Sequence, residues 1–374
     1  MDLALSETQQ MLKQLTRELL EKEFPSTTLR EVEASEEGYS RELWKRLGEL
    51  GLTNVAISEA YGGTGGSLLD LGVVLEEMGR GVYIGPFFAT VVLGGLTLLY
   101  AASEAQKRDL LPKVGQGQVL LSLALLEEEG RYEPDAIHLQ AERRDGGYVL
   151  QGTKLFVEYG HVADYLVCVA RTSPQQEGIS LFLVPRSSPG ITITPLITTG
   201  GDKQVEVQFR GVEVPESNLI GQLNQGWSAV RRVLEAATAL LCMQMAGMGE
   251  KVLEITVEYV KQRVQFGRPV GSFQAVQHHA ANMAILSDGA KLAALEAVSR
   301  LSQGLPAAKE VAVAKAFCGR AGFEITYNSH ELNAGVGFMK ESDLQFYTRQ
   351  MHGMRLRFGT TMDHLKVVAR EYGF

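Results

Sequence analysis

The sequence has few cysteines and a deficit of basic residues. Its three cysteines, Cys168, Cys242 and Cys318, form no CxxC pair, so neither a disulfide framework nor a zinc or other metal site is expected, and a reducing, cytoplasmic environment fits. Lysine and arginine total 36 against 44 acidic residues, for a formal net charge of −8. Nucleic-acid and anionic-membrane binding both need clustered basic surface, so neither partner is expected.

Long apolar runs are also missing. The most apolar stretch, ATVVLGGLTLLYAA at 89–102, is short for a membrane span and contains two glycines, so it predicts a buried helix. The first ten residues, MDLALSETQQ, include acidic but no basic residues and predict no targeting segment. A chain of 374 residues is long enough for two or three domains around a large core.

Residues 1–115 are predicted to form an N-terminal α-helical domain. Apolar residues at 11, 12, 15, 19 and 20 follow the 3.6-residue repeat of an amphipathic helix. Ser6 and Gln9, three positions apart, predict a capping box at its start. Two further segments, 40–52 and 68–81, repeat the helical spacing and end at glycine or close to it.

Residues 116–222 have a different pattern and predict a middle β-domain. Short runs rich in valine, isoleucine, leucine and phenylalanine alternate with turn residues, which predicts about five to eight strands in a small antiparallel sandwich or barrel. The sequence DGGY at 145–148 predicts a hairpin turn.

Residues 223–374 predict a C-terminal four-helix bundle. Residues 230–264 contain no proline and would form a helix of about 50 Å, a length typical of bundles. Residues 272–301, residues 309–332 and the last turns of the chain supply the other helices. The fold class is therefore α+β and multidomain: helices, then a β-domain, then a helical bundle.

Five segments, placed on this domain order, carry a resemblance to a known family. They are SEAYGGTGGS (58–67), GTKLFVEYGHVADYLVCVART (152–172), RVQFGRPVGSFQAVQHHAANM (263–283), ELNAGVGFMKESDLQFYTR (331–349) and QVEVQFRGVEVPESNLIGQLNQGW (204–227). The chain resembles the acyl-CoA dehydrogenase family over essentially its whole length, and the third segment is the most specific.

The resemblance implies a cofactor, a reaction and partners. Members of the family bind FAD between the β-domain and the bundle. A carboxylate removes the α-proton of an acyl-CoA thioester while the flavin accepts the β-hydrogen as hydride. Electrons leave to electron-transferring flavoprotein, and the long C-terminal helices pack into tetramers.

Three cofactor-binding residues lie in the most specific segment. By itself, Arg263 followed by Gly267 and Pro269 is an ordinary helix stop. With Phe273 and Gln274 at the family spacing, the resemblance implies that Arg263 contacts the FAD pyrophosphate, because a guanidinium suits phosphate oxygens. Phe266 and Gln274 would lie alongside the cofactor, and the contact would be made across a subunit interface.

Further cofactor positions are implied elsewhere, with departures from the family. Gly335 would let the backbone approach the adenosine end of FAD, but Glu331 replaces the usual glutamine and Ala334 the first glycine of that segment. Phe156 replaces a tryptophan that covers the flavin, and Thr360 keeps a hydroxyl that contacts the cofactor.

The segment that covers the flavin in the family departs more strongly. Here 126–133 reads LEEEGRYE, and its carboxylates at 127, 128, 129 and 133 predict a solvated acidic loop. Glu158 stands where a threonine that contacts flavin N5 is usual.

Neither family position for the catalytic base holds a carboxylate. The stretch RFGTT at 357–361 places Phe358 on the usual base. The alternative position, on the long helix, is occupied by Ala237. Glu235 lies about 200° around the helix from Ala237 and is rejected as a substitute. The catalytic residue of this chain is therefore unknown.

These observations favour a non-catalytic or small subunit of a heteromeric acyl-CoA dehydrogenase. A homologous partner would supply the carboxylate and most of the FAD site, and this chain would donate Arg263. The alternatives are a self-sufficient homotetramer with a relocated base and a flavin-free structural or acyl-CoA-binding protein. A two-component flavin monooxygenase, which shares the fold, ranks lower. The acyl group is not identified by the sequence.

Overall fold

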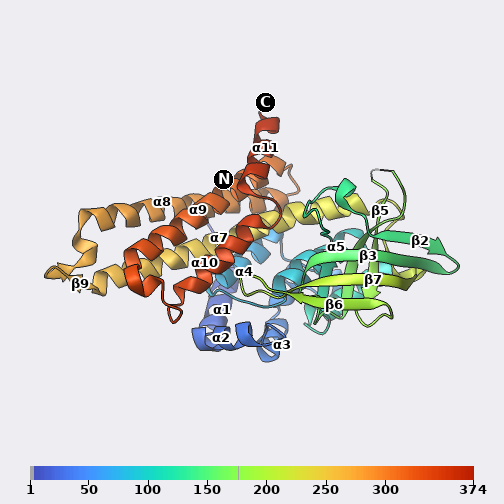
Figure 1. Cartoon of the computed structure of the whole chain (residues 1–374), viewed down its shortest axis with the longest axis horizontal. Coiled ribbons are helices and arrows are strands. Elements are labelled where there is room, and N and C mark those ends of the chain that lie inside the picture. Colours follow the sequence, from blue (N-terminus) through green and yellow to red (C-terminus); the bar gives the residue numbers. More distant parts are fainter. Residues whose placement is uncertain (1–3, 176) are drawn as a thin grey trace.

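The computed structural model describes residues 4–175 and 177–374. It is elongated, with helices at one end and a twisted sheet at the other (Figure 1). An N-terminal helical part, a middle sheet and a C-terminal helical part follow one another along the chain, which confirms the predicted fold class.

The N-terminal part consists of helices, of which the one at Leu68–Arg80 packs along the long helix of the C-terminal part. The capping box of Ser6 and Gln9 is formed as predicted. The apolar run at 89–102 is buried, and it begins as a π-helical segment, Phe88–Gly95, that continues into an α-helix. The helices are α1 (Glu7–Glu23), α2 (Ser26–Ala34), α3 (Arg41–Glu49), α4 (Leu68–Arg80), α5 (Leu96–Ala101) and α6 (Glu104–Gly115).

The middle part is one sheet with a core of its own. The strands are β1 (Leu121–Ala124), β2 (Gln140–Arg144), β3 (Gly147–Glu158), β4 (Tyr165–Arg171), β5 (Ile179–Pro185), β6 (Ile191–Leu196), β7 (Gln204–Pro215) and β8 (Leu219–Ile220). Their order is β6-β7-β3-β2-β4-β5-β8, with β1 beside β4. The pairs β1–β4 and β2–β4 are parallel, so the sheet is mixed where an antiparallel one was predicted. The hairpin at DGGY joins β2 and β3 as predicted.

The C-terminal part is built on one long helix. Its helices are α7 (Gly226–Gln262), α8 (Gln274–Ser302), α9 (Ala308–Gly337), α10 (Leu344–Leu356) and α11 (Thr361–Glu371). The 37 residues of α7 span about 55 Å at 1.5 Å per residue. A small hairpin, β9 (Val264–Gln265) and β10 (Arg268–Pro269), follows α7 at the end of the molecule away from the sheet (Figure 1). Among the described residues, none of the helices combines the length and the apolar character that crossing a bilayer requires.

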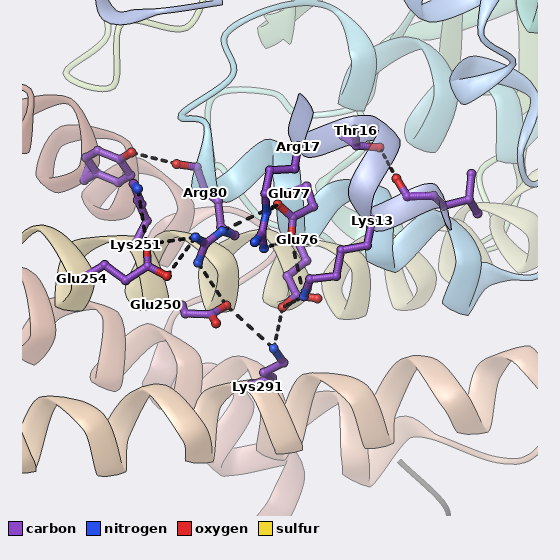
Figure 2. Close-up of polar contacts among 12 residues, drawn as sticks. Lys13, Thr16, Arg17, Glu76, Glu77, Arg80, Glu250, Lys251, Glu254 and Lys291 are labelled. Atoms are coloured by element: carbon purple, nitrogen blue, oxygen red, sulfur yellow. Dashed lines mark hydrogen bonds and ion pairs between the residues drawn. The ribbon is translucent and has the colours of Figure 1, made fainter. Parts of the chain in front are cut away.

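Buried charges hold α1 and α4 to the bundle (Figure 2). Glu76 on α4 contacts Lys13 on α1 at 3.0 Å and Lys291 on α8 at 2.8 Å. Glu77 binds both the Nε and the Nη2 of Arg17 at 2.8 Å. The side chains of both glutamates are only 1% exposed, so these ion pairs join three helices, α1, α4 and α8, inside the helical half.

Candidate functional site

The main cleft lies where the turn between α10 and α11 faces the end of β3. It contains a cavity of about 650 Å³, within the range of small-molecule sites. Apolar side chains, among them Tyr132, Phe156 and Leu356, share its lining with Glu158 and Arg357. Phe156, a predicted flavin-covering residue, is therefore at the cleft.

Several bulky residues around this cleft have a strained backbone. Phe156, Tyr159 and Phe358 have φ values of 55°, 53° and 57°. Positive φ is a rare conformation for such side chains and costs on the order of 1–3 kcal/mol at each residue. Strain of this kind concentrates at functional sites, which supports the assignment of the cleft.

Phe358 at the base position is packed into an aromatic group. Its ring stacks on Phe88 with centroids 6.0 Å apart and meets the edge of Tyr132 at 5.8 Å. Ala237, at the second base position, is completely buried, while Glu235 is half-buried. The two positions that could hold a base thus present only apolar side chains.

An ion pair spans the cleft beside Phe358. Nη2 of Arg357 lies 2.6 Å from Oε1 of Glu158, and the two side chains are 18% and 14% exposed. The guanidinium also lies 4.5 Å above the ring of Phe88. Burial raises the pKa of Glu158 above its usual value, and Arg357 opposes this shift. The sequence reasoning missed the pair, although Glu158 was noted as a departure from the family.

A buried lysine fixes the turn that carries Arg357 and Phe358. Nζ of Lys315, on α9, donates to the carbonyl oxygens of Arg355 at 3.0 Å and Gly359 at 2.9 Å. The lysine is completely buried, and burial lowers its pKa to about 8. Nε2 of His364 lies 2.8 Å from the carbonyl oxygen of Phe358. The turn is therefore held from the side of the bundle, a role that no sequence motif indicated.

The prediction of a solvated acidic loop over 127–133 is wrong for Glu127. This carboxylate is buried, accepts N–H bonds from His138 and Leu139 at 2.9 and 3.0 Å, and contacts Nζ of Lys154 at 2.6 Å. Burial removes water from the carboxylate, so it needs these three donors. The other carboxylates of the segment, Glu128, Glu129 and Glu133, are exposed as predicted.

The residues predicted to bind the pyrophosphate lie far from this cleft. Arg263 caps the end of α7, and Phe266, 91% exposed with φ 55°, is at the turn of the β9–β10 hairpin. Gln274 is exposed at the start of α8. The hairpin and the sheet are at opposite ends of the molecule (Figure 1). The structure thus does not bring Arg263, Phe266 and Gln274 together with Phe156 of the same chain.

The remaining predicted cofactor residues are at helix ends. Glu331 and Gly335 are exposed near the end of α9, beside a kink at Ala334, whose φ of 50° would favour the glycine usual in the family. Thr360 is the N-cap of α11 and forms a capping box with Asp363. Their roles toward a cofactor stay predictions.

The chain matches one protein family along its length. Sequence models for the N-terminal, middle and C-terminal domains of acyl-CoA dehydrogenases match residues 6–118, 122–212 and 224–373. The chain belongs to the acyl-CoA dehydrogenase family. The family comprises FAD-dependent oxidoreductases that act on CH–CH bonds.

One relative and two solved structures illustrate the range of the similarity. An acyl-CoA dehydrogenase of Bacillus subtilis is 28% identical over 95% of both chains. The butyryl-CoA dehydrogenase structure from Megasphaera elsdenii matches with a TM-score of 0.93, at 27% identity over all of both chains. The ChsE4–ChsE5 complex from Mycobacterium tuberculosis contains a chain that matches with a TM-score of 0.91, at 28% identity over 100% of this chain and 99% of that one.

An ion pair and a further carboxylate stand where FAD, the family cofactor, would enter the cleft. The Arg357–Glu158 pair joins the β3 wall directly to the α10–α11 turn, and a second carboxylate, Asp202, lines the same cavity. Nε of Arg357 is buried and, within 4–175 and 177–374, has no hydrogen-bond partner. A flavin ring between these walls would have to separate Arg357 from Glu158, so the cleft with the pair closed does not fit the flavin end of FAD.

Proposed function

We propose that this chain is the non-catalytic subunit of a heteromeric acyl-CoA dehydrogenase. A homologous partner supplies the carboxylate that removes the α-proton and binds most of the FAD. The observation that carries the proposal is Phe358, whose ring packs against Phe88 and Tyr132 where a base would stand. The acyl-CoA substrate is bound by the partner, and electrons leave to electron-transferring flavoprotein.

The exposed hairpin after α7 is this chain's contribution to the partner's cofactor. Arg263 and Phe266 are exposed at the end of the molecule remote from its own cleft. A guanidinium in that position is available to the phosphates of an FAD bound by another subunit. The membership of one matched chain in the ChsE4–ChsE5 complex is consistent with a heteromeric assembly.

Large apolar side chains exposed on α8 and α9 supply a surface for the partner. Ile285, Leu292 and Tyr327 are each at least half exposed. Extended apolar surface of this kind marks protein–protein contacts. The proposed assembly is a tetramer of two heterodimers in which these helices are covered.

The test is co-purification with a homologous chain that has the base, followed by native mass and flavin absorbance. Arg263→Ala should lower the flavin content of the complex while the complex stays assembled. Lys261→Ala, an exposed cation on the last turn of the same helix, is the matched control and should retain flavin. Equal flavin content in the two variants, or a fully loaded and active chain without any partner, would contradict the proposal.

A self-sufficient homotetramer is the second candidate, and one observation favours it. Glu158 is a carboxylate in the cleft with a raised pKa, which is the property of a general base. This candidate requires the pair with Arg357 to open. It predicts that the chain purified alone is yellow and reduces a dye with an acyl-CoA, and that Glu158→Gln abolishes this reaction.

A further inference from the structure

Two cavities of very different size meet at the ion pair. The outer cavity, of about 650 Å³, and an inner cavity, of about 80 Å³, share part of their walls. The shared residues are Glu158, Asp202, Gln204, Gly353 and Arg357. The inner cavity is otherwise lined mainly by apolar side chains of α4 and the segment after it, including Leu75, Met78, Phe87 and Phe88.

Arg357 and Glu158 are the charged pair within this common wall. Their contact of 2.6 Å leaves no space between β3 and the α10–α11 turn at that point. The guanidinium also covers Phe88, which lines the inner cavity. A group that enters the inner cavity from the outer one at this point has to separate the two charges.

Both halves of the pair are held by rigid structure. Glu158 ends β3 and is paired in register with Gln204 of β7. Lys315 donates hydrogen bonds to the carbonyl oxygens of Arg355 and Gly359 in the turn that carries Arg357. The ring of Phe358 stacks on that of Phe88. Rotation of Arg357 away from Glu158 would leave a carboxylate of low exposure without its partner, which is unfavourable.

We propose that the Arg357–Glu158 pair is a partition that excludes an acyl chain from the inner cavity of this subunit. An acyl chain carries no group that could compensate the separated charges, and the inner cavity is far below the roughly 300 Å³ that small-molecule sites need. This proposal rests on the proposed non-catalytic role, because that role is the reason for taking acyl-CoA as the ligand. It explains why this subunit does not compete with its partner for substrate.

The test compares the binding of hexanoyl-CoA and free CoA to the purified full chain by calorimetry. The native chain should bind the two alike, because the acyl group finds no site. Glu158→Thr with Arg357→Ala removes both charges and opens the wall, and should bind hexanoyl-CoA about tenfold tighter than CoA, a difference of about 1.4 kcal/mol. The matched control is Glu216→Thr with Arg143→Ala, an exposed ion pair of the sheet that lines neither cavity and should leave binding unchanged.

Two outcomes would overturn the partition. One is a native chain that already prefers hexanoyl-CoA over CoA. The other is an opened variant that unfolds cooperatively and yet gains no preference. If the opened variant does not fold, Glu158→Gln with Arg357→Met keeps the side-chain volumes, removes the charges and should show a smaller gain in the same direction. Neither readout involves flavin or the partner, so failure here is distinct from failure of the heteromeric function.

Discussion

Two glutamates of low exposure, Glu76 in the bundle and Glu158 in the cleft, are in contrasting electrostatic environments. Burial alone would raise the pKa of Glu76, but Lys291 and Lys13 lower it below the usual value. Burial raises the pKa of Glu158, which has only Arg357 to oppose the shift, and Asp202 raises it further. Two cations thus keep Glu76 ionised, whereas the one cation beside Glu158 does not fully offset the effect of burial on its pKa.

The difference separates a structural ion pair from one at a functional site. The charges around Glu76 join α1, α4 and α8 and have alternative partners within the network (Figure 2). The Arg357–Glu158 pair joins only the two walls of the cleft and lies between two cavities. Carboxylates with raised pKa values cluster at functional sites, in agreement with the placement of Glu158.

The largest predicted effect is in the bundle. Glu76→Ala leaves Lys13 and Lys291 without the carboxylate between them and should lower the free energy of unfolding by about 3–5 kcal/mol at neutral pH. Because the folded pKa of Glu76 is lowered, its stabilisation is complete above the unfolded value of 4.5 and is lost as the pH falls through the folded value. The gap between native and variant, measured by urea denaturation, should therefore shrink in acid.

Glu142→Ala is the control, since that glutamate is 72% exposed and only 4.0 Å from Arg144. Its cost should stay below about 0.5 kcal/mol, as for most surface substitutions. A similar cost for both variants would mean that the network does not support the fold.

The fold and the ends of many elements were predictable because they depend on local pattern. The 3.6-residue spacing, the Ser6–Gln9 capping box and the DGGY turn all act within a few residues of sequence. The parallel pairing of β1 with β4 was not predictable from alternation, since it depends on which distant strands meet.

The residues of the cleft were only partly predictable. Phe358 and Phe156 could be placed by resemblance, but Arg357 and Glu158 are 199 positions apart and no spacing rule connects them. A partial signal was present, because Glu158 places a carboxylate where a threonine is usual in the family. Lys315 gave no signal, as its acceptors are backbone carbonyls rather than side chains.

The next effect tests Lys315, a buried cation that faces the thiols of Cys242 and Cys318 and the guanidiniums of Arg357 and Arg355. The unfolded lysine keeps its proton to about pH 10.5, whereas the folded one releases it near 8. Between these values the unfolded state binds more protons, so the stability contribution rises with pH. Relative to Lys315→Met, the native chain should gain about 2–4 kcal/mol from pH 7.5 to 10.5. A constant difference across that range would show that the folded lysine keeps its proton as the unfolded one does, and would contradict the lowered pKa.

The smallest effect is expected in the cleft itself. Arg357→Ala leaves Glu158 unpaired and should cost about 1–3 kcal/mol. Since the folded pKa of Glu158 is raised, the folded state retains its proton where the unfolded state has lost it, and the cost should grow as the pH rises above the unfolded value of 4.5. Glu158→Thr with Arg357→Ala removes the unpaired carboxylate, so the double variant should recover part of the loss and show a flatter pH profile. The opposite result would be a double variant whose free energy of unfolding is lower than that of Arg357→Ala. The pair would then contribute to the fold in the same way as the charges around Glu76, and the contrast between bundle and cleft would be lost.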